Sequence, residues 1–234
     1  FKSLMDVMGA TWEEIDAAVP TSANYYSDPV YPLPVASKIE QAVELLSQAE
    51  RPLVYFGMGA RNAHDELLEL SSKLKLPLIS THPSKGSIAD DFPAFLGSAG
   101  RVATKPAVEA LSAADVIVWV GNDMPFASKL VNSHQKIIQI DVDAQKFGKR
   151  FADELSILAD AKVALRALID ASPELPGTAF YRASLANKQN WEEWLATFAN
   201  DSRTPLRVEP IFHLLNEVSK PDDVFLVDVG NINI

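Results

Sequence analysis

The sequence predicts an α/β fold of three layers, in which helices cover both faces of a parallel sheet. Short apolar runs alternate with segments of helical periodicity from about residue 36 to residue 171. The short runs are apolar at successive positions, which is typical of parallel strands that are buried on both faces. Strands that alternate with helices in this way are joined by right-handed crossovers into a parallel sheet.

The first elements show this alternation. Residues 36–49 place their apolar side chains on one helical face, and Arg51-Pro52 ends that helix. Residues 53–56 (LVYF) form a continuous apolar run that ends at Gly57, as expected of a buried strand. The further predicted helices are 63–75, 105–113 and 161–171, and the further predicted strands are 77–81, 116–121, 136–141 and 156–159.

Two stretches interrupt the alternation. Residues 82–100 are rich in glycine and proline, and no strand or helix is predicted there. Residues 172–177 form a linker, and the apolar stripe of Trp191, Trp194 and Leu195 beyond it is interpreted as a packing surface. The elements predicted after the linker are helices at 178–199 and 210–219 and a strand at 224–230.

The two ends of the chain are interpreted as cuts within a longer polypeptide. The chain begins with Phe1, and it stops shortly after a predicted strand that would need neighbours. The alternative is a naturally short protein with a terminal strand. The predicted division is 1–34 as a linker from a preceding domain, 35–175 as a central domain, and 176–234 as a linker helix with the truncated start of a further domain.

Composition disfavours several classes of protein. The 234 residues carry 21 Lys and Arg against 31 Asp and Glu, a formal net charge of −10, which disfavours nucleic-acid binding. No apolar run reaches the length of about 18 residues that a membrane-spanning helix needs. Cysteine is absent, which removes disulfides and thiolate sites, and we expect a cytoplasmic protein.

A glycine-containing turn follows the predicted strand at 53–56. In Gly57-Met58-Gly59-Ala60-Arg61, backbone amides and the dipole of the next helix could bind a phosphate. The turn lacks the third glycine of the dinucleotide-binding fingerprint, because Asn62 occupies that position. No acid ends the following strand at Ser80-Thr81 either, and a plain tight turn is the alternative.

Polar residues after other strands are further candidates. A carboxylate at Asp141 or Asp143 could accept both hydroxyls of a ribose, or it could cap the next turn. Arg101 follows a loop of small residues, where it could pair with an anion or stack on a planar ring. The basic residues Lys146, Lys149 and Arg150 are interpreted as a solvated face.

Motifs for metal binding and for serine hydrolysis are missing from the sequence. The four histidines have no metal-ligand spacing, so we expect no metal site in this chain. No G-x-S-x-G sequence is present, which removes the best-marked serine-hydrolase motif.

Several segments occur in a distinctive order. They are Arg51–Arg61 (RPLVYFGMGAR), Pro77–Gly86 (PLISTHPSKG), Leu96–Pro106 (LGSAGRVATKP), Val120–Phe126 (VGNDMPF) and Ile138–Arg150 (IQIDVDAQKFGKR), followed by Leu158–Ala161 and Asp228–Asn233. In this order and with these gaps, the chain from about residue 35 onward resembles the thiamine-diphosphate-dependent pyruvate oxidase family.

The resemblance implies a Rossmann-like middle domain that binds FAD, within a protomer of three α/β domains. The first and last domains would hold thiamine diphosphate and Mg²⁺ across a subunit interface, and the full-length enzyme is expected to be a homotetramer. The thiamine-activating glutamate would lie before Phe1 and the Mg²⁺ ligands after Ile234. The resemblance therefore implies no catalytic residue and no metal ligand in this chain, and Asp228-Val229-Gly230 is not the metal motif.

The resemblance also implies roles for the residues that follow the strands. Asp141 would bind the adenosine ribose, while Asp160 and the backbone of Ala161 would meet the adenine. The residues expected to contact the ribityl chain, the pyrophosphate or the flavin are Thr81, Arg101, Asn122 and Asp123. The amides expected to hold the pyrophosphate are those of Gly57, Gly59, Ala60 and Arg61.

The activity implied for the whole enzyme is the oxidative decarboxylation of pyruvate. Electrons would pass to FAD and then to oxygen, and phosphate would capture the acetyl group. Acetolactate synthase and quinone-linked pyruvate dehydrogenase are alternatives, because they share the middle-domain architecture. A free-standing nucleotide-binding module without turnover is a third.

Overall fold

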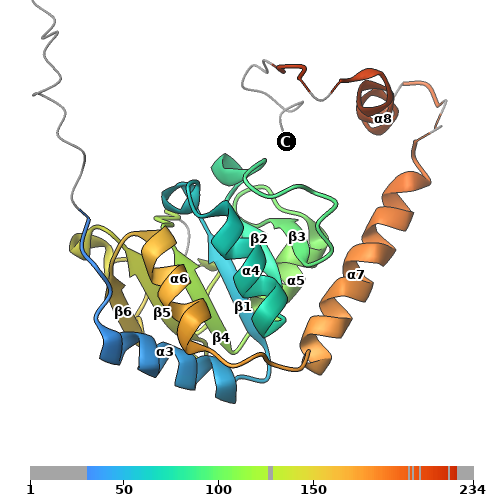
Figure 1. The fold of residues 1–234 in the computed structure, drawn as a ribbon. Helices are drawn as coiled ribbons and strands as arrows, with labels where there is room; N and C mark the ends of the chain where they lie inside the picture. Colours follow the sequence, from blue (N-terminus) through green and yellow to red (C-terminus); the bar gives the residue numbers. More distant parts are fainter. Residues whose placement is uncertain are drawn as a thin grey trace, which may run out of the picture. The chain divides into compact units, whose positions relative to one another are not determined.

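The computed structural model describes residues 31–125, 129–199, 201, 203–205, 207–220 and 222–225. Its centre is a six-stranded parallel sheet with strand order β3-β2-β1-β4-β5-β6 (Figure 1). The strands are β1 (Pro52–Phe56), β2 (Leu78–Ser80), β3 (Phe95–Ser98), β4 (Val116–Val120), β5 (Lys136–Asp141) and β6 (Leu155–Leu158). The predicted α/β fold with a parallel sheet is confirmed.

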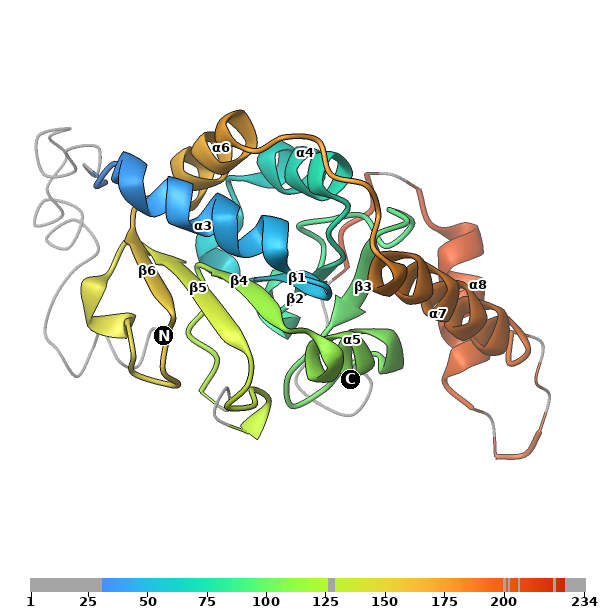
Figure 2. The same ribbon diagram turned by 90° about the horizontal axis from the view of Figure 1, so that it is seen from below.

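Helices cover both faces of the sheet (Figure 2). On one face lie α3 (Ala36–Gln48), α4 (His64–Leu74) and α6 (Ala161–Ala171), while α5 (Lys105–Ala113) lies on the other. Two more helices follow in the chain, α7 (Ala179–Ala196) and α8 (Glu209–Val218). None of the helices in the described part of the chain is long and apolar enough to cross a membrane.

Alternate side chains of the central strands enter two different cores. Val54 and Phe56 pack in the core beneath α3, α4 and α6, whereas Tyr55 and Trp119 belong to the core on the α5 side. Every residue of β1 and of β4 is buried. Because helices cover both faces, successive positions must be apolar, and this explains the continuous runs in the sequence.

The sequence pattern misses one strand. β3 lies within residues 82–100, where no strand is predicted, and it pairs in parallel with β2. The hydroxyl oxygens of Ser80 and Ser98 are 3.0 Å apart across this pairing. The prediction is wrong here because the strand has only four residues, and Gly97 breaks its short apolar run. Gly97 has a φ of +98°, a conformation that favours glycine.

The other predicted elements within the described residues are present, with ends that shift by three residues or fewer. The predicted strand at 224–230 lies mostly outside the described residues, and the described residues 222–225 contain no strand. Almost all of the predicted linker at 1–34 is also outside them. The domain boundaries near residues 35 and 175 stay predictions.

Helix α7 is hydrogen-bonded to the loop before β3 through the buried ammonium group of Lys188. Lys188 is 7% exposed, and its Nζ donates hydrogen bonds to the carbonyl oxygens of Asp90 and Phe92, at 2.6 and 2.9 Å. The rings of Trp191 and Trp194 stack at 4.9 Å, and Trp194 is half exposed. The aromatic stripe on α7 is therefore only partly covered in this chain.

Replacing Leu70 on α4 with alanine tests the core beneath α3, α4 and α6. Leu70 is fully buried, so Leu70→Ala should lower the free energy of unfolding by about 2–5 kcal/mol. Leu33→Ala is the matched control, because Leu33 is 73% exposed and its replacement should change the free energy of unfolding little. Urea denaturation measures both, and equal losses would contradict the assignment of α4 to the core.

Candidate functional site

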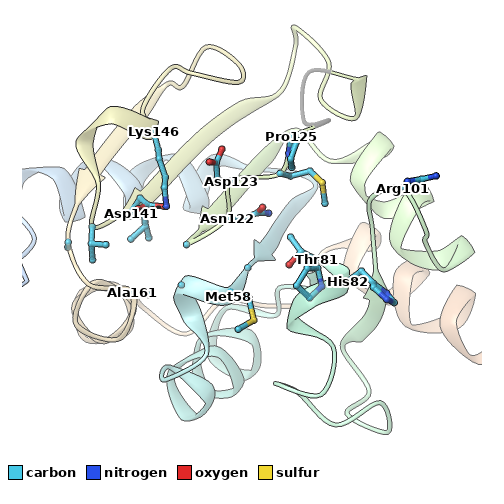
Figure 3. A pocket seen from close by; sticks show the side chains of 18 of the residues that line it. Met58, Thr81, His82, Arg101, Asn122, Asp123, Pro125, Asp141, Lys146 and Ala161 are labelled. Carbon is cyan, nitrogen blue, oxygen red and sulfur yellow. Dashed lines mark hydrogen bonds and ion pairs between the residues drawn. The ribbon is translucent and has the colours of Figure 1, made fainter. Parts of the chain in front are cut away.

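A cavity of about 500 Å³ lies at the carboxyl edge of the sheet (Figure 3). The strand register pairs Phe56 with Val120 and Val120 with Ile140, so the loops after β1, β4 and β5 leave the sheet side by side. The strand order reverses between β1 and β4, since later strands add on the side opposite to β2 and β3. Open parallel sheets bind ligands at such a reversal.

The turn after β1 forms one wall of the cavity. Gly57, Met58 and Gly59 line it, whereas Ala60 is buried beneath the turn and Arg61 is exposed. The four amides predicted to hold a pyrophosphate already donate to backbone carbonyls, so a phosphate would share these donors. The carbonyls that accept from Gly57, Gly59, Ala60 and Arg61 are those of Val120, Gly121, Gly57 and Met58, respectively.

The glycines of this turn permit a close backbone contact. A Cβ atom on Gly59 would lie 2.7 Å from the Cα of Gly121, and one on Gly57 would lie 2.6 Å from the Gly121 carbonyl oxygen. Gly121 itself has φ of +53°, a conformation that favours glycine. The turns after β1 and β4 therefore meet through their backbones, which requires glycine whether or not a ligand is bound.

Several other backbone amides at the cavity are available to a ligand, and those of Met58, Asn122 and Ala161 are among them. The N–H groups of Met58, Asn122 and Ala161 have no acceptor among the described residues, and all three residues line the cavity. Backbone N–H groups seldom stay unpaired away from water. These three are available to oxygen atoms of a bound molecule.

The Asn122 side chain lies in the middle of the cavity wall (Figure 3). Asn122 is 3% exposed, and neither its Oδ1 nor its Nδ2 has a hydrogen-bond partner of normal geometry among the described residues. Its side chain does interact with the Tyr55 hydroxyl, which partly offsets the rise that burial causes in the pKa of Tyr55. A buried polar group without a partner costs about 1–3 kcal/mol. Both amide atoms are buried although the residue lines the cavity, so a polar ligand group could pair with them once the side chain turns toward it.

Asp141 ends β5 at one end of the cavity and is 4% exposed. Its Oδ1 accepts a hydrogen bond from the Asp143 amide at 3.0 Å and lies 3.3 Å from the Nζ of Lys146. Lys146 also lines the cavity, with its ammonium group directed at Asp141 (Figure 3). Asp143 is exposed and instead caps the short helical turn after it, by accepting from the Gln145 amide. The two carboxylates therefore have different roles.

A second ion pair joins two loops of the cavity. The Nε of Arg150 lies 2.8 Å from the Oδ1 of Asp123, which follows β4. The hydrogen bond from the Arg150 guanidinium lowers the pKa of Asp123, and the positive charges of Arg150, Lys149 and Lys146 add to this. The interpretation of the basic cluster as a solvated face is wrong for Lys146 and Arg150, because both pair with carboxylates of the cavity.

The opposite end of the cavity is formed by the loops after β2 and β3. Thr81 is buried, and its hydroxyl oxygen lies 2.9 Å from that of Ser84. His82 and Arg101 also line this end, and Arg101 is exposed. The cavity thus has a carboxylate–ammonium pair at one end and, at the other, the guanidinium of Arg101, which has no ion-pair partner among the described residues (Figure 3).

Asp160 is engaged in local structure at the start of α6. Its carboxylate accepts hydrogen bonds from the amides of Lys162 and Val163, which is an N-cap. Ala161 lines the cavity, whereas Asp160 is not among the residues that line it. The contact of Asp160 with an adenine stays a prediction.

The structure brings most of the predicted residues together. Those that line the cavity are Gly57, Gly59, Thr81, Arg101, Asn122, Asp123, Asp141 and Ala161, and those that do not are Ala60, Arg61 and Asp160. Sequence reasoning misses Lys146, which it interprets as part of a solvated face. The available signal for Lys146 is its position in the turn after Asp141, which returns its side chain to the strand end. Among the described residues no cluster of three or more His, Cys, Asp or Glu could hold a metal ion.

A family model described as "Thiamine pyrophosphate enzyme, central domain" matches residues 39–168. The match covers more than half of the chain and includes all six strands and every residue that lines the cavity. The chain therefore belongs to the thiamine pyrophosphate enzymes, and its sheet is their central domain. The predicted family resemblance is confirmed.

Individual relatives include a "Pyruvate oxidase" from Lactiplantibacillus plantarum, which is 43% identical over 226 residues, 95% of this chain and 38% of the relative. A "Glyoxylate carboligase" from Escherichia coli is 32% identical over 84% of this chain and 33% of the relative. A "Probable acetolactate synthase large subunit" from Methanococcus aeolicus is 34% identical over 56% of this chain and 23% of the relative. The chain thus spans less than half the length of these relatives.

The Asp123–Arg150 pair should make stability depend on pH. A carboxyl whose pKa is lower in the folded state than in the unfolded state, where it is about 3.9, stabilises the fold above that pH. This contribution is lost as the pH falls through the folded-state pKa. Asp123→Asn should therefore cost about 0.5–1 kcal/mol at pH 7, a modest value because solvent screens the pair, and less below pH 4.

Denaturant unfolding of the unsubstituted protein and of Asp123→Asn, between pH 7 and pH 3, measures the difference in their free energies of unfolding. Adding Arg150→Gln to Asp123→Asn should cost little more than Asp123→Asn alone, since the pair is already broken. A difference that stays constant across this pH range would show that the pair makes no electrostatic contribution.

Proposed function

We propose that the cavity binds the FAD of a pyruvate oxidase-type enzyme that depends on thiamine diphosphate. The observation that carries the proposal is Asn122, a buried amide without a partner among the described residues, which lines a cavity where the strand order reverses. The likeness to the Lactiplantibacillus plantarum protein named pyruvate oxidase supports the choice of enzyme.

The end of the cavity at β5 and α6 fits an adenosine. A buried carboxylate at a strand end can accept both hydroxyls of a ribose, and Asp141 is held there by Lys146 and by the Asp143 amide. The free amide of Ala161, at the start of α6, can meet a ring nitrogen of adenine. We assign Asp160 to the same end through its neighbour Ala161.

The middle and the far end fit a pyrophosphate and a flavin. The Met58 amide adds a free donor to the turn of Gly57, Gly59, Ala60 and Arg61, whose own amides can only be shared. Asn122 and Asp123 follow β4, and we assign them, with Thr81 and Arg101, to the ribityl chain, the pyrophosphate or the flavin. Arg101 supplies a planar cation, which can pair with a phosphate or stack on a ring.

The role of this chain is to bind and orient. Bound FAD would supply redox chemistry and thiamine diphosphate the decarboxylation chemistry, while the protein supplies position and electrostatics. We propose that the full-length protein converts pyruvate, phosphate and O₂ to acetyl phosphate, CO₂ and H₂O₂. Thiamine diphosphate and Mg²⁺ would be held by domains outside this chain, in a cytoplasmic homotetramer.

Acetolactate synthase activity is the second candidate, since the Methanococcus aeolicus relative carries that name. The two activities differ in their products. The full-length protein, supplied with both cofactors, Mg²⁺, pyruvate and phosphate, should release peroxide and acetyl phosphate. Acetolactate without peroxide would support the second candidate and refute the first.

The ribose assignment is tested by comparing two neighbouring aspartates. Asp141→Ala should weaken FAD binding at least tenfold more than Asp143→Ala, because it removes charge-assisted hydrogen bonds of about 1.5–3 kcal/mol each. Asp143 is exposed and caps a turn, so its variant is the matched control. Fluorescence titration of the apoprotein with FAD measures both affinities. Equal or reversed effects would remove the ribose assignment.

Replacing Asn122 should have opposite effects on stability and on binding. Asn122→Leu removes a buried amide that has no hydrogen-bond partner of normal geometry among the described residues, so the apoprotein should melt at an equal or higher temperature. FAD affinity should fall at least tenfold, because the ligand loses a donor and an acceptor. Ser172→Ala is the control, since Ser172 also has a buried hydroxyl without a partner among the described residues but does not line the cavity.

Thermal melting with and without FAD records both quantities. Ser172→Ala should leave the shift that FAD produces unchanged. If Asn122→Leu kept the full FAD shift as well, Asn122 would not contact the cofactor.

A further inference from the structure

Two polar aromatic side chains lie beside each other beneath the cavity. Tyr55 of β1 and Trp119 of β4 are partners in the parallel register, and both are at most 1% exposed. Their rings meet edge to face, with centroids 4.6 Å apart. Both lie in the core on the α5 side, whose other members are almost all aliphatic.

Each of these rings donates its one polar hydrogen to a loop of the cavity. The Tyr55 hydroxyl donates to the carbonyl oxygen of Ala99 at 2.7 Å, and the Trp119 Nε1 donates to the carbonyl oxygen of Asn122 at 2.6 Å. The Ala99 carbonyl lies two residues before Arg101. The second carbonyl belongs to Asn122, which lines the cavity.

Trp119 also contacts the loop after β5, through an aromatic ring. The ring of Phe151 packs against Trp119 with centroids 4.7 Å apart. Phe151 follows Arg150, which pairs with Asp123 on the loop after β4. The Tyr55–Trp119 pair therefore contacts the loops that carry Arg101, Asn122 and Arg150.

Packing alone does not explain the hydroxyl of Tyr55. A phenylalanine would fill almost the same volume in this core, and burying a hydroxyl costs free energy unless it is hydrogen-bonded. Burial raises the pKa of Tyr55, so the hydroxyl stays protonated and keeps its hydrogen for donation. Ala99 is fully buried, so its carbonyl lacks ready access to water if the hydroxyl is removed.

We infer that Tyr55 and Trp119 are positioning residues, which hold the loops of Arg101 and Asn122 in the conformation that binds the cofactor. The inference rests on the proposed function, because it takes FAD as the ligand. Neither side chain lines the cavity, so both act through the loop carbonyls, and Tyr55 acts also through its contact with the Asn122 side chain.

Tyr55→Phe tests this inference, because it removes one hydroxyl and keeps the ring. Ser71→Ala is a matched control: Ser71 is fully buried, and its hydroxyl donates to the Leu76 carbonyl at 2.7 Å, in a part of α4 that does not line the cavity. Both variants should melt at lower temperature than the parent and keep its far-ultraviolet circular dichroism.

Only Tyr55→Phe should change the binding of FAD. We expect FAD affinity to fall five- to twentyfold, and the visible circular dichroism of the bound flavin to change, since its surroundings are less fixed. In the apoprotein, amide hydrogen exchange at residues 99–102 should become at least fivefold faster. Ser71→Ala should alter none of these three quantities.

The outcomes separate this inference from the proposed function. If the unsubstituted protein does not bind FAD, the proposed function fails. In that case amide hydrogen exchange still tests the positioning role, because unchanged exchange at residues 99–102 in Tyr55→Phe would overturn it. If the parent binds FAD and Tyr55→Phe binds it with equal affinity and an unchanged flavin spectrum, the inference is overturned while the proposed function stands. Equal losses in Tyr55→Phe and Ser71→Ala would also overturn it, since they would reflect stability alone.

Discussion

The backbone contact between the turns after β1 and β4 determines where the cavity lies. The Gly59 amide donates to the Gly121 carbonyl at 2.9 Å, and neither glycine has room for a Cβ atom. Because this contact uses the amides of Gly57 and Gly59, the backbone donors left for a ligand include those of Met58, which lies between the two glycines, and of Asn122, in the turn after β4. A side chain at either glycine would separate the two turns and displace Asn122 with them.

The polar groups of the cavity are arranged at a cost to the fold. Asn122 keeps two amide atoms unpaired among the described residues, which destabilises the protein without a ligand. The carboxylate of Asp141 would be costlier still if it were buried alone, and Lys146 reduces that cost. The core beneath α3, α4 and α6, with its tightly buried aliphatic side chains, supplies the stability that tolerates these groups.

The central sheet could be predicted because each of its middle strands is a continuous apolar run. β3 could not, because Gly97 interrupts a strand of only four residues. The residues after the strands indicated the site, since parallel strands bring their carboxyl ends to one edge. The pairing of Lys146 with Asp141 and of Arg150 with Asp123 could not be predicted, because it depends on how the loop after β5 folds back.

The two faces of the central strands contribute differently to stability and to the geometry of the cavity. On one face, Phe56 and Val120 are register partners whose side chains are wholly apolar, so they can contribute only packing. One residue earlier on each strand, Tyr55 and Trp119 face the opposite core, and each adds a hydrogen-bond donor to its apolar ring. Side-chain direction alternates along a strand, so these two hydrogen bonds reach the loops from the α5 side. The core beneath α3, α4 and α6 also meets the cavity, through the apolar side chains of Ile140, Ala159 and Ala161. What the α5 side adds is the pair of hydrogen bonds that Tyr55 and Trp119 donate to loop carbonyls.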